Sequence, residues 1–142
     1  MLVEMELNKI VIDEKRQDQL IVLREKGGTR ILPIVIGLNE ASAIKLKISG
    51  FNPPRPLTHD LLYMVIASLD GRIEKIIIDK LEENTFHAKL LIATSTGSAK
   101  AVDARPSDSI ALAVRSRSPI FVDEGILQQS ESFNNGHKGP AV

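Results

Sequence analysis

The chain has 142 residues, of which 43% are hydrophobic and 25% charged, a composition that suits one compact domain with its own core. Its 18 basic and 18 acidic residues give a formal net charge of zero, so no overall positive field draws it to nucleic acid. Cysteine is absent, which excludes disulfides, thiolate catalysis and cysteine-ligated zinc. The N-terminus is acidic and no long apolar segment follows it. We therefore expect no signal peptide, no membrane span and a cytoplasmic location.

The N-terminal quarter of the chain predicts three strands. Apolar and polar residues alternate over residues 3–12, with a change of phase that predicts a β-bulge near Asn8. The segments 19–25 and 30–36 flank a Gly-Gly turn, a pattern typical of a β-hairpin. Pro33 has no N–H to donate, so its strand is expected at a sheet edge or at a bulge.

Two helices are predicted next. Asn39 is a favourable N-cap, and apolar residues recur at helical spacing from there up to Gly50. The alternation over residues 44–48 would also suit a strand, but the start and stop signals favour a helix. A proline-rich loop then leads to Thr58, which is placed to cap the second helix. The apolar stripe of this second helix consists of Leu61, Leu62, Val65, Ile66 and Leu69.

The second half of the chain predicts further strands and a third helix. We divide the sequence into a domain over residues 1–128 and a polar tail over residues 129–142, which we expect to be mobile. Helices and strands do not alternate strictly, so we predict a single compact α+β domain with a largely antiparallel or mixed sheet and about three helices. The expected elements are strands over 72–82, 85–94, 99–103 and 120–122, a helix over 107–115 and a weak helix over 125–129.

Two segments with the same chemistry begin predicted helices. RPLTHD (residues 55–60) and RPSD (residues 105–108) each place an arginine and a proline before a hydroxyl and an aspartate. In the structural interpretation, the hydroxyls cap the helices and the carboxylates interact favourably with the helix dipoles. Capping requires neither the arginines nor His59. In the functional interpretation, an arginine beside a helix N-terminus suits a phosphate, and a histidine serves as general base or acid.

Three blocks of the sequence resemble the bifunctional nuclease domain family. They are LPIVIGLNEASAI (32–44), RPLTHDLL (55–62) and VDARPSDSIALAVRSRSPIFVDE (102–124). The resemblance covers about residues 5–127 and implies a compact α+β domain that cleaves both RNA and DNA. Members of that family often carry an aromatic residue at the position of Val35 and alanine at the position of Ser109. The matching polar positions are Glu40, Arg55, Thr58, His59, Asp60, Asp103, Arg105, Ser107 and Asp108.

These residues support a hypothesis of metal-assisted cleavage of RNA or DNA. Carboxylates with a divalent cation, a histidine and phosphate-binding arginines are the groups that this chemistry requires. The metal would be Mg²⁺ or Mn²⁺. The expected catalytic residues are His59, Asp60 and Asp108. The expected phosphate ligands are Arg55, Arg105, Ser107 and Thr58, and the expected metal ligands are Asp103, Asp108 and Glu40.

A second hypothesis assigns the same groups to binding without catalysis. The two Arg-Pro helix starts would then hold an anionic ligand or a protein partner. We also expect a homodimer that pairs or covers sheet edges, because segments such as Ile76–Ile78 are apolar on both faces of their strand.

Overall fold

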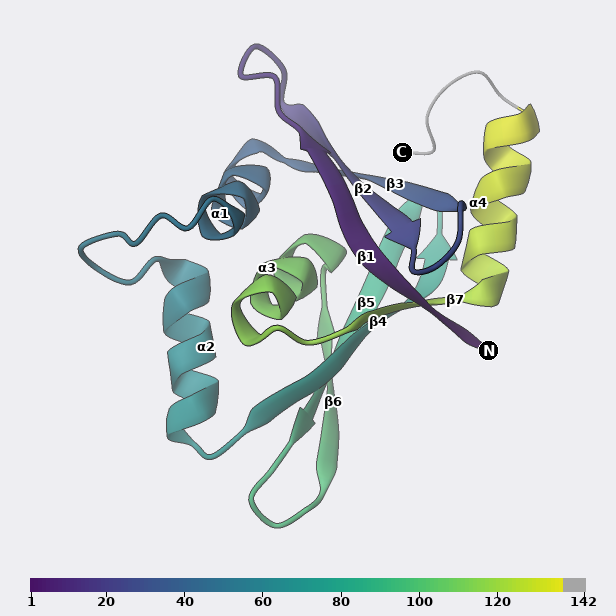
Figure 1. Cartoon of the computed structure of the whole chain (residues 1–142). Coiled ribbons are helices and arrows are strands. Elements are labelled where there is room, and N and C mark those ends of the chain that lie inside the picture. Colours follow the sequence, from purple (N-terminus) through teal and green to yellow (C-terminus); the bar gives the residue numbers. More distant parts are fainter. Residues whose placement is uncertain (137–142) are drawn as a thin grey trace.

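The molecule is built around one sheet (Figure 1). The structure is a computed structural model that describes residues 1–136, and side chains are described over residues 1–130. Within that part, seven strands follow the order β3-β2-β1-β7-β4-β5-β6. The β4–β7 pair is parallel and the other neighbouring pairs are antiparallel, so the predicted α+β class is confirmed. The strands are β1 (Leu2–Val11), β2 (Asp18–Glu25), β3 (Ile31–Gly37), β4 (Arg72–Glu82), β5 (Thr85–Ala93), β6 (Ala99–Ala104) and β7 (Ile120–Asp123).

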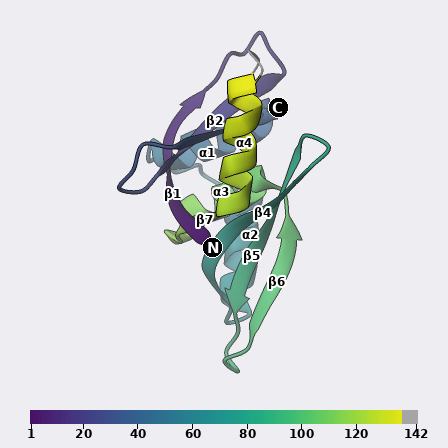
Figure 2. The ribbon, with the colours of Figure 1, turned by 90° about the vertical axis from the view of Figure 1, so that its right-hand side faces the viewer.

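Helices cover both faces of this sheet. Three of them lie on one side and α4 lies on the other, as Figures 1 and 2 show. α3 packs between α1 and α2 and contributes Ile110 and Leu112 to the core, while α4 buries Ile126 and Leu127. The helices are α1 (Leu38–Ile48), α2 (Thr58–Ser68), α3 (Pro106–Ser116) and α4 (Glu124–Gly136), where about three helices and a weak helix over residues 125–129 were predicted.

The helix starts differ from the predicted caps. α1, α2 and α3 follow Gly37, Leu57 and Arg105, and none of these residues caps through its side chain. The predicted caps Asn39, Thr58 and Ser107 therefore stand inside the first helical turns. At α3 a proline explains the earlier start, because Pro106 is the first helical residue and its fixed φ angle suits that position.

Several strand features agree with the sequence pattern. The register of β1 against β2 shifts between Leu7 and Lys9, which confirms the predicted bulge. β3 is an edge strand, which confirms the placement of Pro33. β4 is an interior strand in which Ile76 and Ile78 are fully buried, so these residues are not available to cover an edge.

Helices α2 and α4 have features that the sequence pattern did not predict. The predicted apolar stripe is present on α2, but no residue of α2 is buried, because this helix packs mainly against α3. α4 spans Glu124–Gly136 and so extends beyond the weak helix predicted over residues 125–129. Residues 137–142 of the predicted tail lie outside the described part of the chain. No helix among the described residues is long and apolar enough to span a membrane.

Candidate functional site

The two Arg-Pro helix starts meet in space. His59 is the second residue of α2, and Asp108 is the third residue of α3. Their side chains join these helices, with His59 Nε2 at 2.8 Å from Asp108 Oδ1, and both side chains are mostly buried. Two segments almost fifty residues apart thus form one polar cluster.

A third helix start joins this cluster through Arg105. The Arg105 guanidinium donates from Nε to Asp108 Oδ2 at 2.8 Å and from Nη2 to Asp108 Oδ1 at 3.2 Å. Its Nη2 also lies 3.5 Å from Oε2 of Glu40, in the first turn of α1. The Arg105 side chain remains 64% exposed, so the cation that organises the cluster also faces solvent.

The contacts of Asp108 keep its carboxylate ionised. Burial acts to raise the pKa of Asp108, but the hydrogen bonds from Arg105 and His59 outweigh burial and hold this pKa below its ordinary value. The same pairing raises the pKa of Arg105. At neutral pH the cluster therefore contains a fixed negative charge between a guanidinium and an imidazole.

This charge sets the orientation of the imidazole ring. An ionised carboxylate only accepts hydrogen bonds, so the Nε2 atom of His59 carries the proton that it donates to Asp108. Within residues 1–130, no protein group bonds to the other ring nitrogen, Nδ1. A neutral His59 consequently presents a free lone pair on Nδ1, which is the form that a general base requires.

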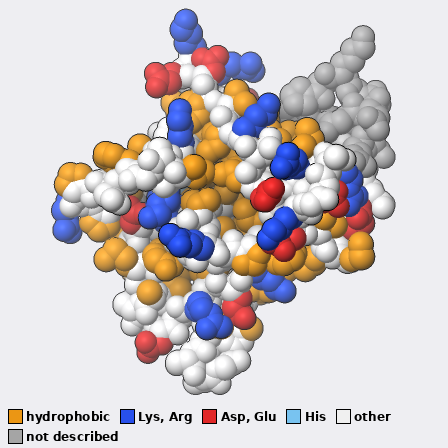
Figure 3. Space-filling view, viewed as in Figure 1, with side chains coloured by type: hydrophobic (Ala, Val, Ile, Leu, Met, Phe, Trp, Pro, Cys, Tyr) orange, Lys and Arg blue, Asp and Glu red, His pale blue; other side chains and the backbone are white. Residues whose placement is uncertain are grey.

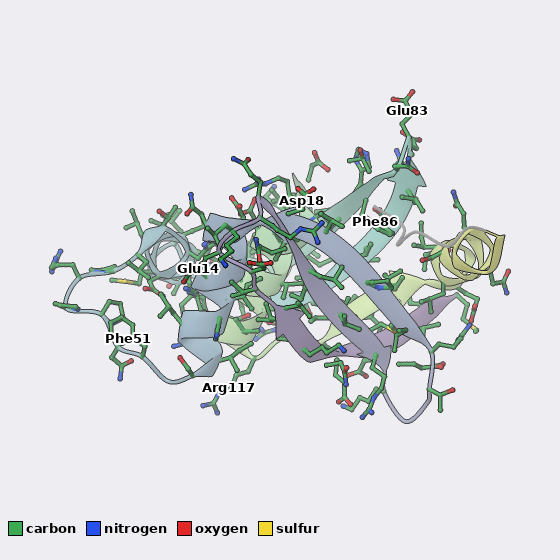
Figure 4. All side chains as sticks on the ribbon, turned by 90° about the horizontal axis from the view of Figure 1, so that it is seen from above. Glu14, Asp18, Phe51, Glu83, Phe86 and Arg117 are labelled. Carbon is green, nitrogen blue, oxygen red and sulfur yellow. The ribbon has the colours of Figure 1, made fainter. Side chains whose placement is uncertain are left out.

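A groove of about 350 Å³ adjoins this cluster at the start of α3. It lies between the end of β3 and the turn that joins β4 to β5, and Asp18 and Phe86 line it from β2 and β5 (Figure 4). Arg105 and Ser107 contribute polar groups from α3. Ser107 is buried and lines this groove, next to the positive end of the helix dipole of α3. The groove thus combines a cation, a hydroxyl and a helix N-terminus.

Asp60, predicted to be catalytic, has different partners. Its Oδ1 accepts from Arg115 Nε at 2.7 Å, and its Oδ2 accepts from the backbone N–H of Leu57 at 2.9 Å. The Leu57 hydrogen bond, followed by the Arg115 pairing, lowers the pKa of Asp60. These contacts tie the start of α2 to the last turn of α3, so they favour a positioning role for Asp60.

The remaining predicted residues are dispersed. Arg55 is exposed before the start of α2, and Thr58 is exposed at its first residue. Asp103 is exposed on β6 opposite Lys89. Among the described residues, no three His, Asp or Glu side chains are grouped as metal ligands. Glu40 and Asp108 instead accept hydrogen bonds from the guanidinium of Arg105. The predicted ligand set of Asp103, Asp108 and Glu40 is therefore not assembled.

Arg115 is a site residue that the sequence reasoning missed. Its side chain is only 3% exposed. Besides Asp60, it bonds to the carbonyl of Ala111 through Nη1 at 2.8 Å. Arg115 follows Asp108 by seven residues, which is two helical turns, so both side chains lie on the α3 face toward α2. That spacing is the signal in the sequence.

The fold and the site define an α+β domain with a histidine–carboxylate pair and an arginine where three helices begin. Residues 21–135 match the family model described as bifunctional nuclease domain. The chain belongs to this family.

Comparison with curated proteins gives relatives of two kinds. An uncharacterised protein of Mycobacterium tuberculosis is 43% identical over 121 residues, which cover 85% of this chain and 71% of that protein. Bifunctional nuclease 1 of Oryza sativa subsp. indica is 21% identical over 128 residues, which are 89% of this chain and 37% of the rice protein. Bifunctional nuclease 2 of Oryza sativa subsp. japonica is 26% identical over 118 residues, or 81% of this chain and 36% of that protein. This chain thus spans little more than a third of each rice protein.

Proposed function

We propose that this chain is a nuclease that cleaves phosphodiester bonds of RNA, DNA or both where α2 and α3 begin. The observation that carries the proposal is the 2.8 Å pair between His59 and Asp108, with Arg105 on the same carboxylate. Membership of the bifunctional nuclease domain family and the names of the rice relatives support the reaction class.

Substrate binding in this proposal depends on the start of α3. The exposed guanidinium of Arg105 and the free N–H groups of the first helical turn attract one phosphate of the strand, with Ser107 as a further donor. Arg55 and Thr58, exposed before and at the start of α2, would contact a neighbouring phosphate. Because the chain has no net charge, affinity depends on this local group of cations.

His59 carries the proton transfer. Its Nδ1 takes the proton of the attacking oxygen, from water or from the 2′-hydroxyl of RNA, as that oxygen bonds to phosphorus. The bond to the leaving oxygen breaks, and this oxygen takes up a proton from the imidazolium or from solvent. Asp108 stays ionised and stabilises the imidazolium, while Arg105 offsets the charge that develops on the phosphate oxygens.

Dependence on Mg²⁺ or Mn²⁺ remains a prediction from the sequence. The chemistry that such a cation would supply is charge stabilisation on the phosphate. Since Glu40, Asp103 and Asp108 are not grouped to hold it, the proton transfer by His59 is derived without it. Assays with excess EDTA and with each metal separate the two cases.

The decisive experiment compares two histidines of the same chain. Wild type, His59→Gln, Asp108→Asn and the control His87→Gln are purified identically and assayed on single-stranded RNA, single-stranded DNA and duplex DNA. His87 follows the groove residue Phe86 on β5, and strand alternation directs its side chain to the opposite face of the sheet from Phe86. We expect rate losses of about 100-fold or more in the first two variants, the usual contribution of acid–base catalysis, and wild-type rates in the control.

Two outcomes of that experiment contradict the proposal. Equal rates in all four proteins would assign the cleavage to a contaminant or to another site. No cleavage by wild type with any metal or substrate would exclude a nuclease. Circular dichroism of each variant establishes that a lost rate is not lost folding.

A second function, the binding of an anion without cleavage, is also supported by the groove beside Arg105. The groove beside Arg105 needs only binding, not proton transfer, to hold an anion. In that case an unreactive oligonucleotide would raise the melting temperature of wild type without turnover, and Arg105→Gln would abolish this shift.

A homodimer and a cytoplasmic location, both expected from the sequence, complete the proposal.

A further inference from the structure

A second groove, of about 250 Å³, lies between α2 and the loop over residues 51–57. Its apolar walls include Met64 of α2 and, on the loop, Phe51 and three prolines. Phe51 stands at one end of the molecule (Figure 4), and it is 50% exposed. In Figure 3, hydrophobic and basic side chains lie together over this loop, at the left of the molecule. We name this space the loop groove.

The charged side chains of the loop groove have a positive balance. Lys47 from α1, Asp60 from α2 and Arg115 from α3 all line it. Asp60 is paired with Arg115 at 2.7 Å, so the exposed Lys47 supplies the charge that is not balanced. Two cations and one carboxylate leave one positive charge. The groove therefore attracts an anion, and its apolar walls suit a ligand that also has a hydrophobic or aromatic part.

The guanidinium of Arg115 is a buried donor with hydrogen bonds still to make. It is only 3% exposed, and it bonds through Nε to Asp60 and through Nη1 to the carbonyl of Ala111. Within residues 1–130, no protein group accepts a hydrogen bond from its Nη2 atom. Nη2 is not one of the fully buried unpaired atoms of these residues, so it reaches open space, and the loop groove is a space that Arg115 lines. Since buried donors require acceptors, Nη2 favours an acceptor that enters this groove.

The loop groove lies close to the helix starts along the chain. Asp60 follows His59 directly in α2, and Arg115 follows Asp108 by seven residues in α3. At 1.5 Å per residue, these seven residues extend about 10 Å along the helix. Successive phosphates of one strand are about 3.4 Å apart along the axis of a duplex, so a strand bound at His59 reaches the groove within about three nucleotides.

On the basis of the nuclease function proposed above, we propose that the loop groove binds one nucleotide of the substrate strand beside the cleaved one. Lys47 and Nη2 of Arg115 donate to the phosphate of this nucleotide, and its base stacks on the exposed ring of Phe51. A base that is paired in a duplex must first leave its stack to reach the ring, which costs free energy. The groove therefore makes the chain prefer single strands to duplexes.

Tryptophan fluorescence tests the base contact. The chain has no tryptophan, so Phe51→Trp places a single indole in the groove. Ile31→Trp is the matched control, because Ile31 on β3 is also 50% exposed. Each variant is titrated with a phosphorothioate single strand, which resists cleavage. We expect the emission of Phe51→Trp to be quenched as a base stacks on the indole, and the emission of Ile31→Trp to stay unchanged. An abasic strand of the same length should quench neither variant.

The salt dependence of binding tests the phosphate contact. Lys45 and Lys47 are both exposed on α1, but only Lys47 lines the groove. Fluorescence anisotropy measures the affinity of Lys47→Gln, Lys45→Gln and wild type for a labelled phosphorothioate single strand over a range of salt concentrations. One lost phosphate contact lowers the slope of log affinity against log salt by about 0.7 for a single strand. We expect this decrease in Lys47→Gln and the wild-type slope in Lys45→Gln. Wild type should also bind the single strand more tightly than the duplex of the same sequence.

Failure of the groove and failure of the nuclease give different results. Cleavage by wild type, with no quenching in Phe51→Trp or with equal slopes in the two lysine variants, would overturn the nucleotide site and leave the nuclease intact. Quenching by the strand without any cleavage by wild type would support the nucleotide site and contradict the nuclease. Binding of a polyglutamate peptide that depends on Lys47, together with no binding of the strand, would overturn the proposal in favour of an acidic protein segment.

Discussion

Asp108 illustrates how one side chain connects structure and chemistry. A carboxylate in the first turn of α3 would stabilise the helix dipole in any case. Because Arg105 and His59 also bond to it, the same carboxylate fixes the arginine and determines which ring nitrogen of His59 is free. The same residue therefore fits the structural interpretation of RPSD and carries part of the proposed function.

Ser109 gives a prediction at the residue scale. Its hydroxyl is fully buried in α3 and has no hydrogen-bond partner. Ser109→Ala should therefore raise the free energy of unfolding by about 1 kcal/mol, since a buried unpaired hydroxyl is removed and alanine favours the helix. Urea denaturation measures the change.

Ser116→Ala is the matched control in the same helix. Its hydroxyl bonds to the carbonyl of Leu112 and to Ser118, so this change should lower the free energy of unfolding. A loss of stability in Ser109→Ala as large as that in Ser116→Ala would show that the Ser109 hydroxyl is satisfied in solution.

At the scale of elements, α2 is attached to α3 mainly through polar contacts. His59 bonds to the first turn of α3, and Asp60 bonds to Arg115 in its last turn. Apolar contact is limited, since Ile66 is the partly buried side chain of α2 that packs on the core. The helix that carries His59 thus depends on one hydrogen bond and one ion pair for its position.

Asp60→Asn tests this attachment. The change leaves the buried guanidinium of Arg115 without its charged partner, which costs about 3 to 5 kcal/mol for fully buried pairs. Because Asp60 is partly exposed, we expect a smaller loss, about 2 to 3 kcal/mol, in urea denaturation. The control is Glu6→Gln, whose pair with Arg24 is half-exposed at 3.5 Å and should contribute less than about 1 kcal/mol. Equal losses in the two variants would contradict the role of Asp60.

At the scale of the whole molecule, ion pairs connect parts that are distant in sequence. Arg30, before β3, bonds to Glu25 at 2.9 Å and to Glu124, the first residue of α4, at 2.6 Å. This pairing lowers the pKa of both glutamates, just as Asp60 and Asp108 have lowered pKa values on the other side of the sheet. The carboxylates on both faces therefore respond to pH in the same direction.

Stability should consequently fall in acid. A carboxylate with a lowered pKa in the folded state contributes stability above its ordinary value, 3.8 for Asp and 4.5 for Glu, and loses it as the pH falls through the lowered value. We expect the melting temperature to be nearly constant from pH 7 to about pH 5 and to decrease steeply below pH 4.5. Asp60→Asn should show a shallower decrease. A melting temperature that is unchanged or higher at pH 3 would contradict these pairings.

The sequence by itself determined most local elements and pointed to some residues of the candidate site. Alternation of apolar residues placed the β1 strand with its bulge, and Pro33 marked an edge, because both follow from the geometry of neighbouring residues. The repeated Arg-Pro pattern singled out His59, Arg105 and Asp108, since it contained groups that capping does not need.

The tertiary structure alone decided which of those residues meet. His59 and Asp108 are joined because α2 and α3 pack side by side, a relation that no local pattern contains. The same packing gives Asp60 to Arg115 and leaves Asp103 apart on β6. It also leaves the large apolar side chains of α2 exposed, because this helix packs mainly against α3 and buries none of its residues. Periodicity identifies an apolar face, but only packing decides whether that face is buried.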